Sequence, residues 1–279
     1  MPSQDQQART AQVAALFDRV AETYDAVGVP WFTPIAEGLV RVAAPAPGER
    51  ALDVGCGRGA ATLPLAAAVG DGGHVTGIDL APRMLEACAA EVARRGLSQV
   101  DLRLLDAGDP ALPAGHYDLV VSSLVLFFLP DPPAALAAWQ RLLVPGGRLA
   151  ISTFGPRDQI WEDLDAVFKP YLPAGMLDAR TTGAAGPFGS DEGVEKLVTA
   201  AGFSGARTAV MDLEVTFADV DEWYRFSHSH GQRAMWEAVS AAYHDAVRAR
   251  AAGHLEQARG ADGRIRLNQR VRYTLATAG

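Results

Sequence analysis

The chain has 279 residues, of which 49% are hydrophobic and 21% are charged, so it can fill the core of one large α/β domain. Its formal net charge of −8 disfavours a surface that neutralises nucleic-acid phosphates, and its longest apolar stretch, residues 119–129, is too short to span a bilayer. Only two cysteines occur, and the first ten residues lack the apolar segment of a signal peptide. We therefore expect a cytoplasmic protein, monomeric or homodimeric, with neither a nucleic-acid nor a membrane partner.

The first fifty residues predict two helices and a loop. Residues 5–24 place Val13, Phe17, Val20 and Tyr24 at helical spacing, which indicates an amphipathic helix. The sequence GVPWFTP then turns the chain into a second helix, and APAPGER follows as a loop.

From Arg50 to Thr153, runs typical of strands alternate with runs typical of helices. Strands are predicted at residues 51–54, 74–80, 100–107, 117–128 and 148–153, and helices at 60–69, 82–95 and 132–143. This alternation predicts a parallel sheet with right-handed crossovers and helices on both faces. Ligands of such sheets bind beyond the carboxyl ends of the strands.

The remaining chain has a different character. Residues 154–189 are rich in glycine and proline, and they precede a predicted helix at 190–201, strands at 208–217 and 264–275, and a helical segment at 219–257 with one break near Gly231. We expect a single domain over residues 1–279, with a core formed by residues 48–155, 190–217 and 263–277. Residues 1–44, 156–189 and 218–262 should form a helical cap.

The most informative stretch is LDVGCGRGA, at residues 52–60. It satisfies the dinucleotide fingerprint G-x-G-x-x-G/A, which alone is a weak signal. Asp53 ends the preceding strand, where a pyrophosphate would meet its carboxylate at unfavourably close range. A ligand with an ammonium or sulfonium group would be attracted instead, and S-adenosylmethionine carries both. A nicotinamide dehydrogenase is consistent only if Asp53 turns away from the ligand.

Several segments in a fixed order make the identification more specific. LDVGCGRG resembles the first motif of the class I S-adenosylmethionine-dependent methyltransferases, and the most similar branch contains enzymes of ubiquinone and menaquinone biosynthesis. The resemblance runs from Phe17 to Thr153 through FDRVAETYD, VTGIDLAPRML, LLDAGDPALP, YDLVVSSLVLFFLPDP and RLLVPGGRLAIST, and KLVTAAGF continues it. It implies S-adenosylmethionine as the cofactor and a Rossmann-like, doubly wound, seven-stranded sheet that is parallel except for its last strand.

The resemblance also implies which residues bind the methionine part of the cofactor. Gly55 and Gly57 should let the backbone approach it, because a Cβ would clash there. Ser122 follows the fourth strand, where the family's backbone meets the cofactor. Tyr24, in the predicted lid, should lie against the methionine part, although packing within the lid explains this residue equally well.

Two further positions are implied to bind the adenosine part. Asp79 and Leu80 end the second strand, where the Asp79 carboxylate should accept hydrogen bonds from the ribose hydroxyls. Asp106 should accept from the adenine amino group, with the Ala107 N–H facing the ring. A cap on the following helix or turn is the alternative for both carboxylates. Arg58 either pairs with the cofactor carboxylate or stays solvated.

Methyl transfer to a hydroxyl or an acidic C–H also requires deprotonation, which a histidine can assist, whereas an enolate, a carboxylate or a free amine needs no base. Where many relatives carry histidines, this chain has Phe127 and Phe128, so a base must lie elsewhere. In the helix predicted from Asp219, His230 shares a face with Trp223 and Phe226, and it is our candidate base. A polar helix end near Gly231 is the alternative.

Acceptor binding is predicted for several cap residues. Arg233 can anchor an acidic group, while Trp31, Trp223 and Phe226 are typical either of a pocket for a small aromatic ligand or of an ordinary core. No metal-ligand spacing is present.

We therefore expect in-line methyl transfer to the oxygen or carbon of a small, apolar or aromatic metabolite of secondary metabolism. The alternative is a cofactor-binding protein of the same fold that catalyses a cyclisation or rearrangement. SSLVLFF replaces the Asn/Asp-Pro-Pro-aromatic sequence of base-methylating enzymes, which disfavours a nucleic-acid substrate.

Overall fold

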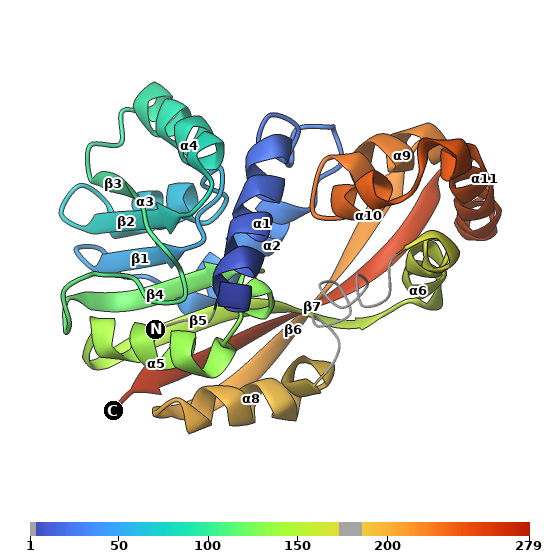
Figure 1. The fold of residues 1–279 in the computed structure, drawn as a ribbon. Coiled ribbons are helices and arrows are strands. Elements are labelled where there is room, and N and C mark those ends of the chain that lie inside the picture. Colours follow the sequence, from blue (N-terminus) through green and yellow to red (C-terminus); the bar gives the residue numbers. More distant parts are fainter. Residues whose placement is uncertain (1–3, 173–185) are drawn as a thin grey trace.

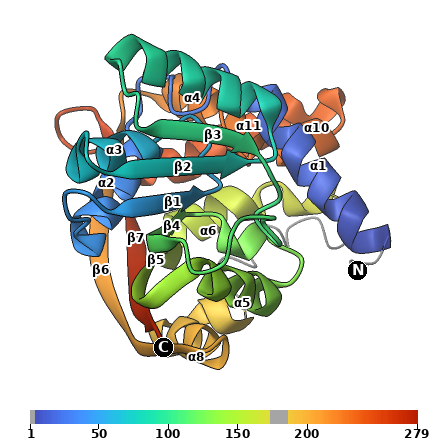
Figure 2. The same ribbon diagram turned by 90° about the vertical axis from the view of Figure 1, so that its left-hand side faces the viewer.

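The computed structural model describes residues 4–172 and 186–279, and one seven-stranded sheet organises them in the order β3-β2-β1-β4-β5-β7-β6 (Figure 1; Figure 2). The strands are β1 (Arg50–Val54), β2 (His74–Asp79), β3 (Val100–Leu104), β4 (Tyr117–Ser123), β5 (Leu143–Arg157), β6 (Phe203–Phe217) and β7 (Ile265–Ala278). Only β7 runs against its neighbours, β5 and β6. The predicted Rossmann-like sheet with an antiparallel last strand is confirmed.

Helices cover both faces of this sheet. They are α2 (Phe32–Ala43), α3 (Thr62–Val69), α4 (Pro82–Arg95), α5 (Pro132–Leu142) and α8 (Asp191–Ala200). Asp131 accepts a hydrogen bond from the Ala134 N–H and Ser190 accepts one from the Gly193 N–H, so these side chains cap the start of α5 and α8. Cys56 and Cys88 are buried free thiols within this core.

The strand order reverses beside β1. β2 and β3 follow one another outward on one side of β1, and the chain then returns to place β4 on the other side. In open α/β sheets the crevice at such a reversal, beyond the carboxyl ends of the strands, is the usual ligand site. The glycine-rich turn after β1 lies at this point.

The cap forms at the far end of the β6–β7 pair. α9 (Val220–His228), α10 (Arg233–Ala238) and α11 (His244–Leu255) connect these strands, and they gather there with α6 (Gln159–Ala166), as Figure 1 shows. α1 (Gln4–Val20) lies between this group and the half of the sheet that holds β1 to β4 (Figure 1). Residues 173–185 of the predicted cap segment lie outside the described residues.

Several elements differ from the prediction: α1 ends at Val20, and β5 and β6 begin earlier, at Leu143 and Phe203. The predicted strand at 117–128 ends at Ser123, because Leu124 adopts a left-handed conformation with φ +58° and a short 3-10 turn follows at Leu126–Phe128. The helical segment after Asp219 is broken a second time at Val239, which is extended. α6 was not predicted, since its surroundings are rich in glycine and proline.

Candidate active site

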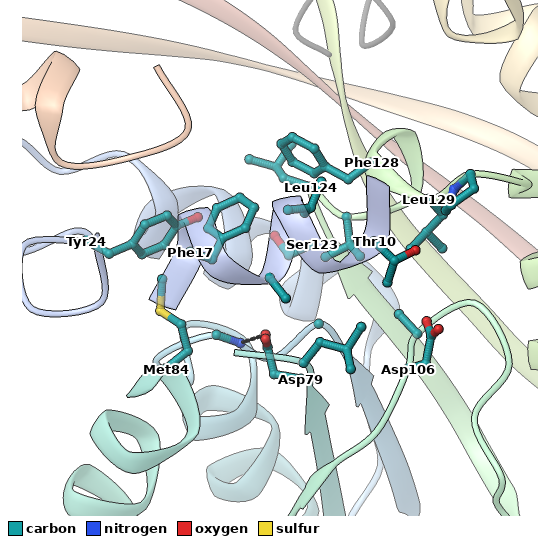
Figure 3. A pocket seen from close by; sticks show the side chains of 18 residues that line it. Thr10, Phe17, Tyr24, Asp79, Met84, Asp106, Ser123, Leu124, Phe128 and Leu129 are labelled. Atoms are coloured by element: carbon teal, nitrogen blue, oxygen red, sulfur yellow. Dashed lines mark hydrogen bonds between the residues drawn. The ribbon is translucent and has the colours of Figure 1, made fainter. Parts of the chain in front are cut away.

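Two adjoining cavities open at the carboxyl ends of β1, β2 and β4. The lid cavity lies beneath α1, and the acidic cavity lies beside the glycine turn; Tyr24, Gly55, Gly57 and Ser123 belong to the walls of both. The lid cavity is also lined by Thr10, Val13, Ala14, Phe17, Asp79, Leu80, Met84, Asp106, Ala107, Leu124, Val125, Phe128, Leu129 and Pro130 (Figure 3). It encloses about 750 Å³ of empty space, part of it open to solvent, which is a size typical of small-molecule sites.

The glycine turn brings bare backbone to both cavities. Gly55 and Gly57 have φ values of +74° and +52°, a region that favours glycine. A Cβ on Gly55 would lie 2.4 Å from Val125 Cγ2, whereas a Cβ on Gly57 would have no atom within 4 Å. Gly55 is therefore required by the protein's own packing, and Gly57 leaves cavity space open to a ligand.

Asp79 ties this turn to the start of α4. Its Oδ2 accepts a hydrogen bond from the Gly57 N–H at 2.8 Å, drawn in Figure 3, and its Oδ1 accepts from the Ala81 N–H at 2.8 Å. Burial raises the pKa of Asp79, and the two N–H donors oppose that shift. The capping contact that was the alternative for Asp79 is thus present, and Asp79 and Leu80 line the lid cavity as well.

Asp106 lies at the other end of the lid cavity floor (Figure 3). Its Oδ1 accepts from the Gly108 N–H at 2.7 Å, which is again the turn contact that was left open as an alternative. The carbonyl of Ala107 accepts from the Trp139 indole N–H at 2.7 Å, so the loop is fixed to α5. Both residues are in the cavity wall, Asp106 with an exposed carboxylate.

Ser123, rather than the predicted Ser122, faces the cavities. Ser122 is 1% exposed, and its hydroxyl donates to the carbonyl of Val54 at 2.9 Å. Successive side chains of a strand point to opposite faces, so only one of two adjacent serines can face the ligand side. Nothing in the dipeptide Ser122-Ser123 indicates which of the two side chains faces the cavities. Leu124, which bends the chain at this point, is the next wall residue.

The acidic cavity has three carboxyl residues in its wall, Asp25, Glu37 and Asp53, and two arginines, Arg58 and Arg95. Asp53 is 1% exposed, and its Oδ2 accepts from the Thr62 hydroxyl at 2.6 Å. Burial raises the pKa of Asp53 to about 7, with the Thr62 hydroxyl opposing the shift and Asp79 adding to it. A cation in this cavity would favour the ionised form of Asp53.

Tyr24 stands where the two cavities meet. Its ring stacks on Phe32 with 4.1 Å between centroids and meets the edge of Phe17 at 6.0 Å. Figure 3 shows its hydroxyl directed into the cavity. Burial, followed by the charges of Asp25 and Asp79, holds the pKa of Tyr24 well above its usual range, so the phenol stays protonated and can donate a hydrogen bond.

Arg58 has a role that neither sequence alternative anticipated. Its Nη1 donates to the carbonyl oxygens of Ala21, Glu22 and Tyr24, at the turn that follows α1. The glycine turn is thereby joined to the lid. Only the presence of an arginine between two glycines could have drawn attention to it.

The predicted acceptor residues are not in the walls of these two cavities. His230 is 5% exposed and packs against Phe226 and Phe32, with ring centroids 4.5 and 5.9 Å away, and its Nδ1 accepts from the Gln232 N–H at 3.3 Å. Arg233 pairs with Glu237 at 2.8 Å. The base role of His230 and the anchor role of Arg233 stay predictions.

The three aromatic residues proposed for the acceptor are packed in the cap interior. Trp31 contacts Trp161 and Phe226 with centroids 5.1 and 5.4 Å away, and Trp223 contacts Trp236 at 6.3 Å. Trp31, Trp223 and Phe226 are at most 3% exposed. Within the described residues, their surroundings are those of an ordinary hydrophobic core, which was the alternative to a ligand pocket.

In residues 4–172 and 186–279, no three His, Cys, Asp or Glu side chains lie close enough together to hold a metal ion. Within the same ranges no helix has the length and apolarity needed to cross a membrane.

Comparison with known proteins agrees with this geometry. A family model described as a methyltransferase domain matches residues 52–151. The chain is 40% identical over 234 residues to nocamycin O-methyltransferase of Saccharothrix syringae. This aligned region covers 80% of this chain and 84% of that protein. It is 42% identical over 167 residues to aklanonic acid methyltransferase DauC of Streptomyces sp. strain C5, over 60% of this chain and 76% of that protein.

A solved structure shares the fold. Phosphoethanolamine N-methyltransferase 2 of Haemonchus contortus, in complex with phosphomonomethylethanolamine and S-adenosylhomocysteine, superposes with a TM-score of 0.57 and 18% identity, over 93% of this chain and 57% of that one. The cavities here suit S-adenosylmethionine, since Asp79 and Asp106 offer acceptors to hydroxyl and amino groups and the carboxyl groups of the acidic cavity can attract an ammonium group. The chain belongs to the class I S-adenosylmethionine-dependent methyltransferases, and S-adenosylmethionine is its cofactor.

Proposed function

We propose that this methyltransferase methylates an oxygen of a small, largely apolar metabolite, and that this oxygen belongs to a carboxylic acid or an enol that ionises by itself near neutral pH. Two similar enzymes, named for nocamycin O-methylation and for aklanonic acid, support an acidic oxygen acceptor. The proposal rests mainly on the composition of the wall where the two cavities meet, which is largely apolar.

The cofactor is assigned across both cavities. Asp79 and Leu80 hold the ribose and Asp106 and Ala107 hold the adenine, all in the wall of the lid cavity. The methionine part then reaches the acidic cavity, where its ammonium group is attracted by Asp53.

This arrangement brings the reacting groups beside the glycine turn. Gly55 and Gly57 give the methionine part room to approach the backbone. The reacting methyl group is thereby placed near Tyr24 and Ser123, which both cavities share.

The lid-cavity side of this wall is largely apolar and offers no free base. Phe17, Leu124 and Phe128 are apolar, and among the described lining residues of the lid cavity the titratable groups are Tyr24, Asp79 and Asp106. Tyr24 stays protonated at neutral pH because its pKa is raised, and the two carboxylates are assigned to the adenosine part. An acceptor oxygen that already carries a negative charge needs no proton removal.

The chemistry then depends on alignment. When bound, S-adenosylmethionine supplies a methyl group on a sulfonium, and the sulfur keeps the electron pair of the S–C bond while an oxygen lone pair forms the C–O bond. The apolar wall favours this reaction because the separated charges of an anion and a sulfonium neutralise one another as it proceeds. The protein's part is to hold both reactants in line and to keep water out.

The test is a comparison of acceptors with the purified enzyme. A polycyclic aromatic carboxylic acid, the matching primary amide and the matching unactivated alcohol are each incubated with S-adenosylmethionine, and S-adenosylhomocysteine and the methylated product are measured. We expect turnover of the acid and at least 100-fold less of the amide and the alcohol. Equal turnover of the alcohol would contradict the proposal.

Two further measurements distinguish the proposed reaction from its alternatives, which are base catalysis by His230 and a reaction without methyl transfer. His230→Gln should retain turnover within about threefold if the acceptor ionises by itself, whereas a loss of about 10²-fold with unchanged cofactor affinity would show that His230 is the base. Product that forms without S-adenosylhomocysteine would show a cyclisation or rearrangement instead of methyl transfer.

A further inference from the structure

We infer that Arg58 is a positioning residue that joins the lid to the cofactor-binding turn and fixes Tyr24 in the shared cavity wall. Arg58 lies between Gly57 and Gly59 in that turn. Its Nη1 lies 2.8 Å from the Ala21 carbonyl oxygen, 2.9 Å from that of Glu22 and 3.2 Å from that of Tyr24.

These carbonyl groups close the lid helix. α1 ends at Val20, and the last carbonyls of a helix and its closing turn lack partners within the helix. They also carry the negative end of the helix dipole, so a cation is favourable there. Arg58 therefore acts as a C-terminal cap for α1 that is supplied by the cofactor-binding turn.

The segment at 21–25 is held from its other end as well. Asp25, with φ +52°, accepts hydrogen bonds from the N–H groups of Phe32 at 3.2 Å and Thr33 at 2.9 Å, at the start of α2. Tyr24 stands between this contact and the Arg58 contact, with its ring stacked on Phe32. The Arg58 contacts and the Asp25 contacts hold residues 21–25 from both sides as a clamp, and together they fix the position of the Tyr24 ring.

The remaining polar contacts at the end of α1 go elsewhere. At the start of α4, Asp18 accepts from the Arg83 N–H at 2.8 Å and Glu22 pairs with the Arg83 guanidinium. Arg19 pairs with Glu237 of α10 at 2.8 Å. Arg58 differs from them because its neighbours Gly57 and Gly59 belong to the turn that the cofactor contacts. It is thus placed to couple the lid to cofactor binding.

Loss of this contact should affect binding more than folding. Val20 is the one residue that α1 buries fully, so the helix adds little to the core. Its middle turns instead supply Thr10, Val13 and Phe17 to the lid cavity. A lid released from Arg58 would therefore leave the core intact and weaken contacts to the adenosine part.

The experiment measures the affinity of Arg58→Met for two probes by calorimetry. S-adenosylhomocysteine carries the amino-acid part, and 5′-methylthioadenosine lacks both its ammonium and its carboxylate. We expect both Kd values to rise by the same factor, about tenfold or more, because the lid covers the part that the probes share. The Tm without ligand should change by less than about 3 °C.

Arg94→Met is the control, with Arg94 in the place of Arg58 as a guanidinium outside the binding site. Arg94 lines neither cavity, and its Nε donates to Glu91 of its own helix at 2.8 Å. Its substitution should change both Kd values less than twofold. An effect as large as that of Arg58→Met would mean that loss of positive charge, and not loss of the clamp, is responsible, which would overturn the inference.

Further outcomes decide the mode of action. A loss confined to S-adenosylhomocysteine would show that Arg58 pairs with the cofactor carboxylate, and no loss for either probe would contradict any coupling to the lid. Combining Arg58→Met with Tyr24→Ala should weaken binding by clearly less than the product of the single losses, because one residue acts through the other. If Arg58→Met fails to fold, Arg58→Lys carries the test: equal partial losses for both probes support the clamp, and wild-type affinity refutes it.

Discussion

The cofactor-binding half and the cap of this molecule are held in place by different means. In the cofactor-binding half, hydrogen bonds join side chains to backbone groups: the Asp79 carboxylate accepts from the N–H groups of Gly57 and Ala81, and the Ala107 carbonyl accepts from the indole N–H of Trp139. In the cap, Trp31, Trp161 and Phe226 hold one another by ring contacts. Backbone-defined sites follow short sequence motifs, whereas ring packing joins α2, α6 and α9 from distant parts of the chain.

The largest expected effect tests the backbone-defined half. Asp79→Ala removes an acceptor from two backbone N–H groups and from the ribose hydroxyls assigned to it. Hydrogen bonds to a charged group are each worth about 1.5–3 kcal/mol, so we expect the affinity for S-adenosylhomocysteine to fall by 100-fold or more. Calorimetry measures it, with Asp109→Ala as the exposed control. A change of less than threefold for Asp79→Ala would contradict the assigned role.

A second prediction separates the two glycines of the turn. Gly55→Ala places a Cβ 2.4 Å from Val125 Cγ2 at a positive φ, so it should destabilise the fold by about 2–4 kcal/mol. Gly57→Ala meets no atom within 4 Å, so it should cost about 1 kcal/mol of stability but at least tenfold in cofactor affinity. Denaturant unfolding and calorimetry report the two quantities. The reverse pattern would place the ligand beside Gly55 instead.

The sequence predicted the backbone-defined half well because its signals are local. Strand, glycine turn and acidic strand end occur within a few residues, so Asp53, Asp79 and Asp106 could be placed at one edge of the sheet, where they line the two cavities, without any knowledge of tertiary contacts. The sequence did not show that Ser123, and not Ser122, lines the cavities. Adjacent residues of a strand face opposite sides of the sheet, so an error of one residue reverses the side that the side chain faces.

The cap was predicted less well because its contacts are not local. Helical spacing grouped Trp223, Phe226 and His230 on one face, but α9 ends at His228, so His230 lies beyond the helix. The spacing also could not tell whether that face meets a cavity or a core. That depends on α2 and α6, which pack against α9 from elsewhere in the chain. The contact from Arg58 to Ala21 spans 37 positions and has no periodic signal.

A third prediction concerns pH. The pKa of Asp53 is raised from 3.8 to about 7, so Asp53 is protonated in the free enzyme below pH 7. The folded protein binds this proton more tightly than the unfolded chain does. Protonated Asp53 therefore adds to the free energy of unfolding below pH 3.8, and this contribution is lost as the pH rises from 3.8 to 7. A ligand ammonium group beside Asp53 favours the ionised form, so S-adenosylhomocysteine, which carries such a group, should bind about tenfold more tightly at pH 7 than at pH 5.5. Asp53→Asn should abolish this slope, and a slope that persists would assign it to another group.

The smallest expected effect lies in the cap. Arg233 is partly exposed and shares Glu237 with Arg19, and exposed ion pairs contribute about 0–1 kcal/mol. Arg233→Ala should therefore shift the unfolding midpoint only slightly and leave cofactor affinity unchanged. Steady-state kinetics with an acidic acceptor provide the sharper measurement. A KM increase of tenfold or more at unchanged kcat would show that Arg233 anchors the acceptor.

The most direct test of the account is a crystal structure with S-adenosylhomocysteine. It should show the adenine beside Asp106, the ribose hydroxyls at Asp79, and the ammonium group in the cavity lined by Asp25, Glu37 and Asp53. The thioether sulfur should lie beside Tyr24 and Ser123. Binding in the opposite direction, with the adenine in the acidic cavity, or away from the glycine turn, would contradict it.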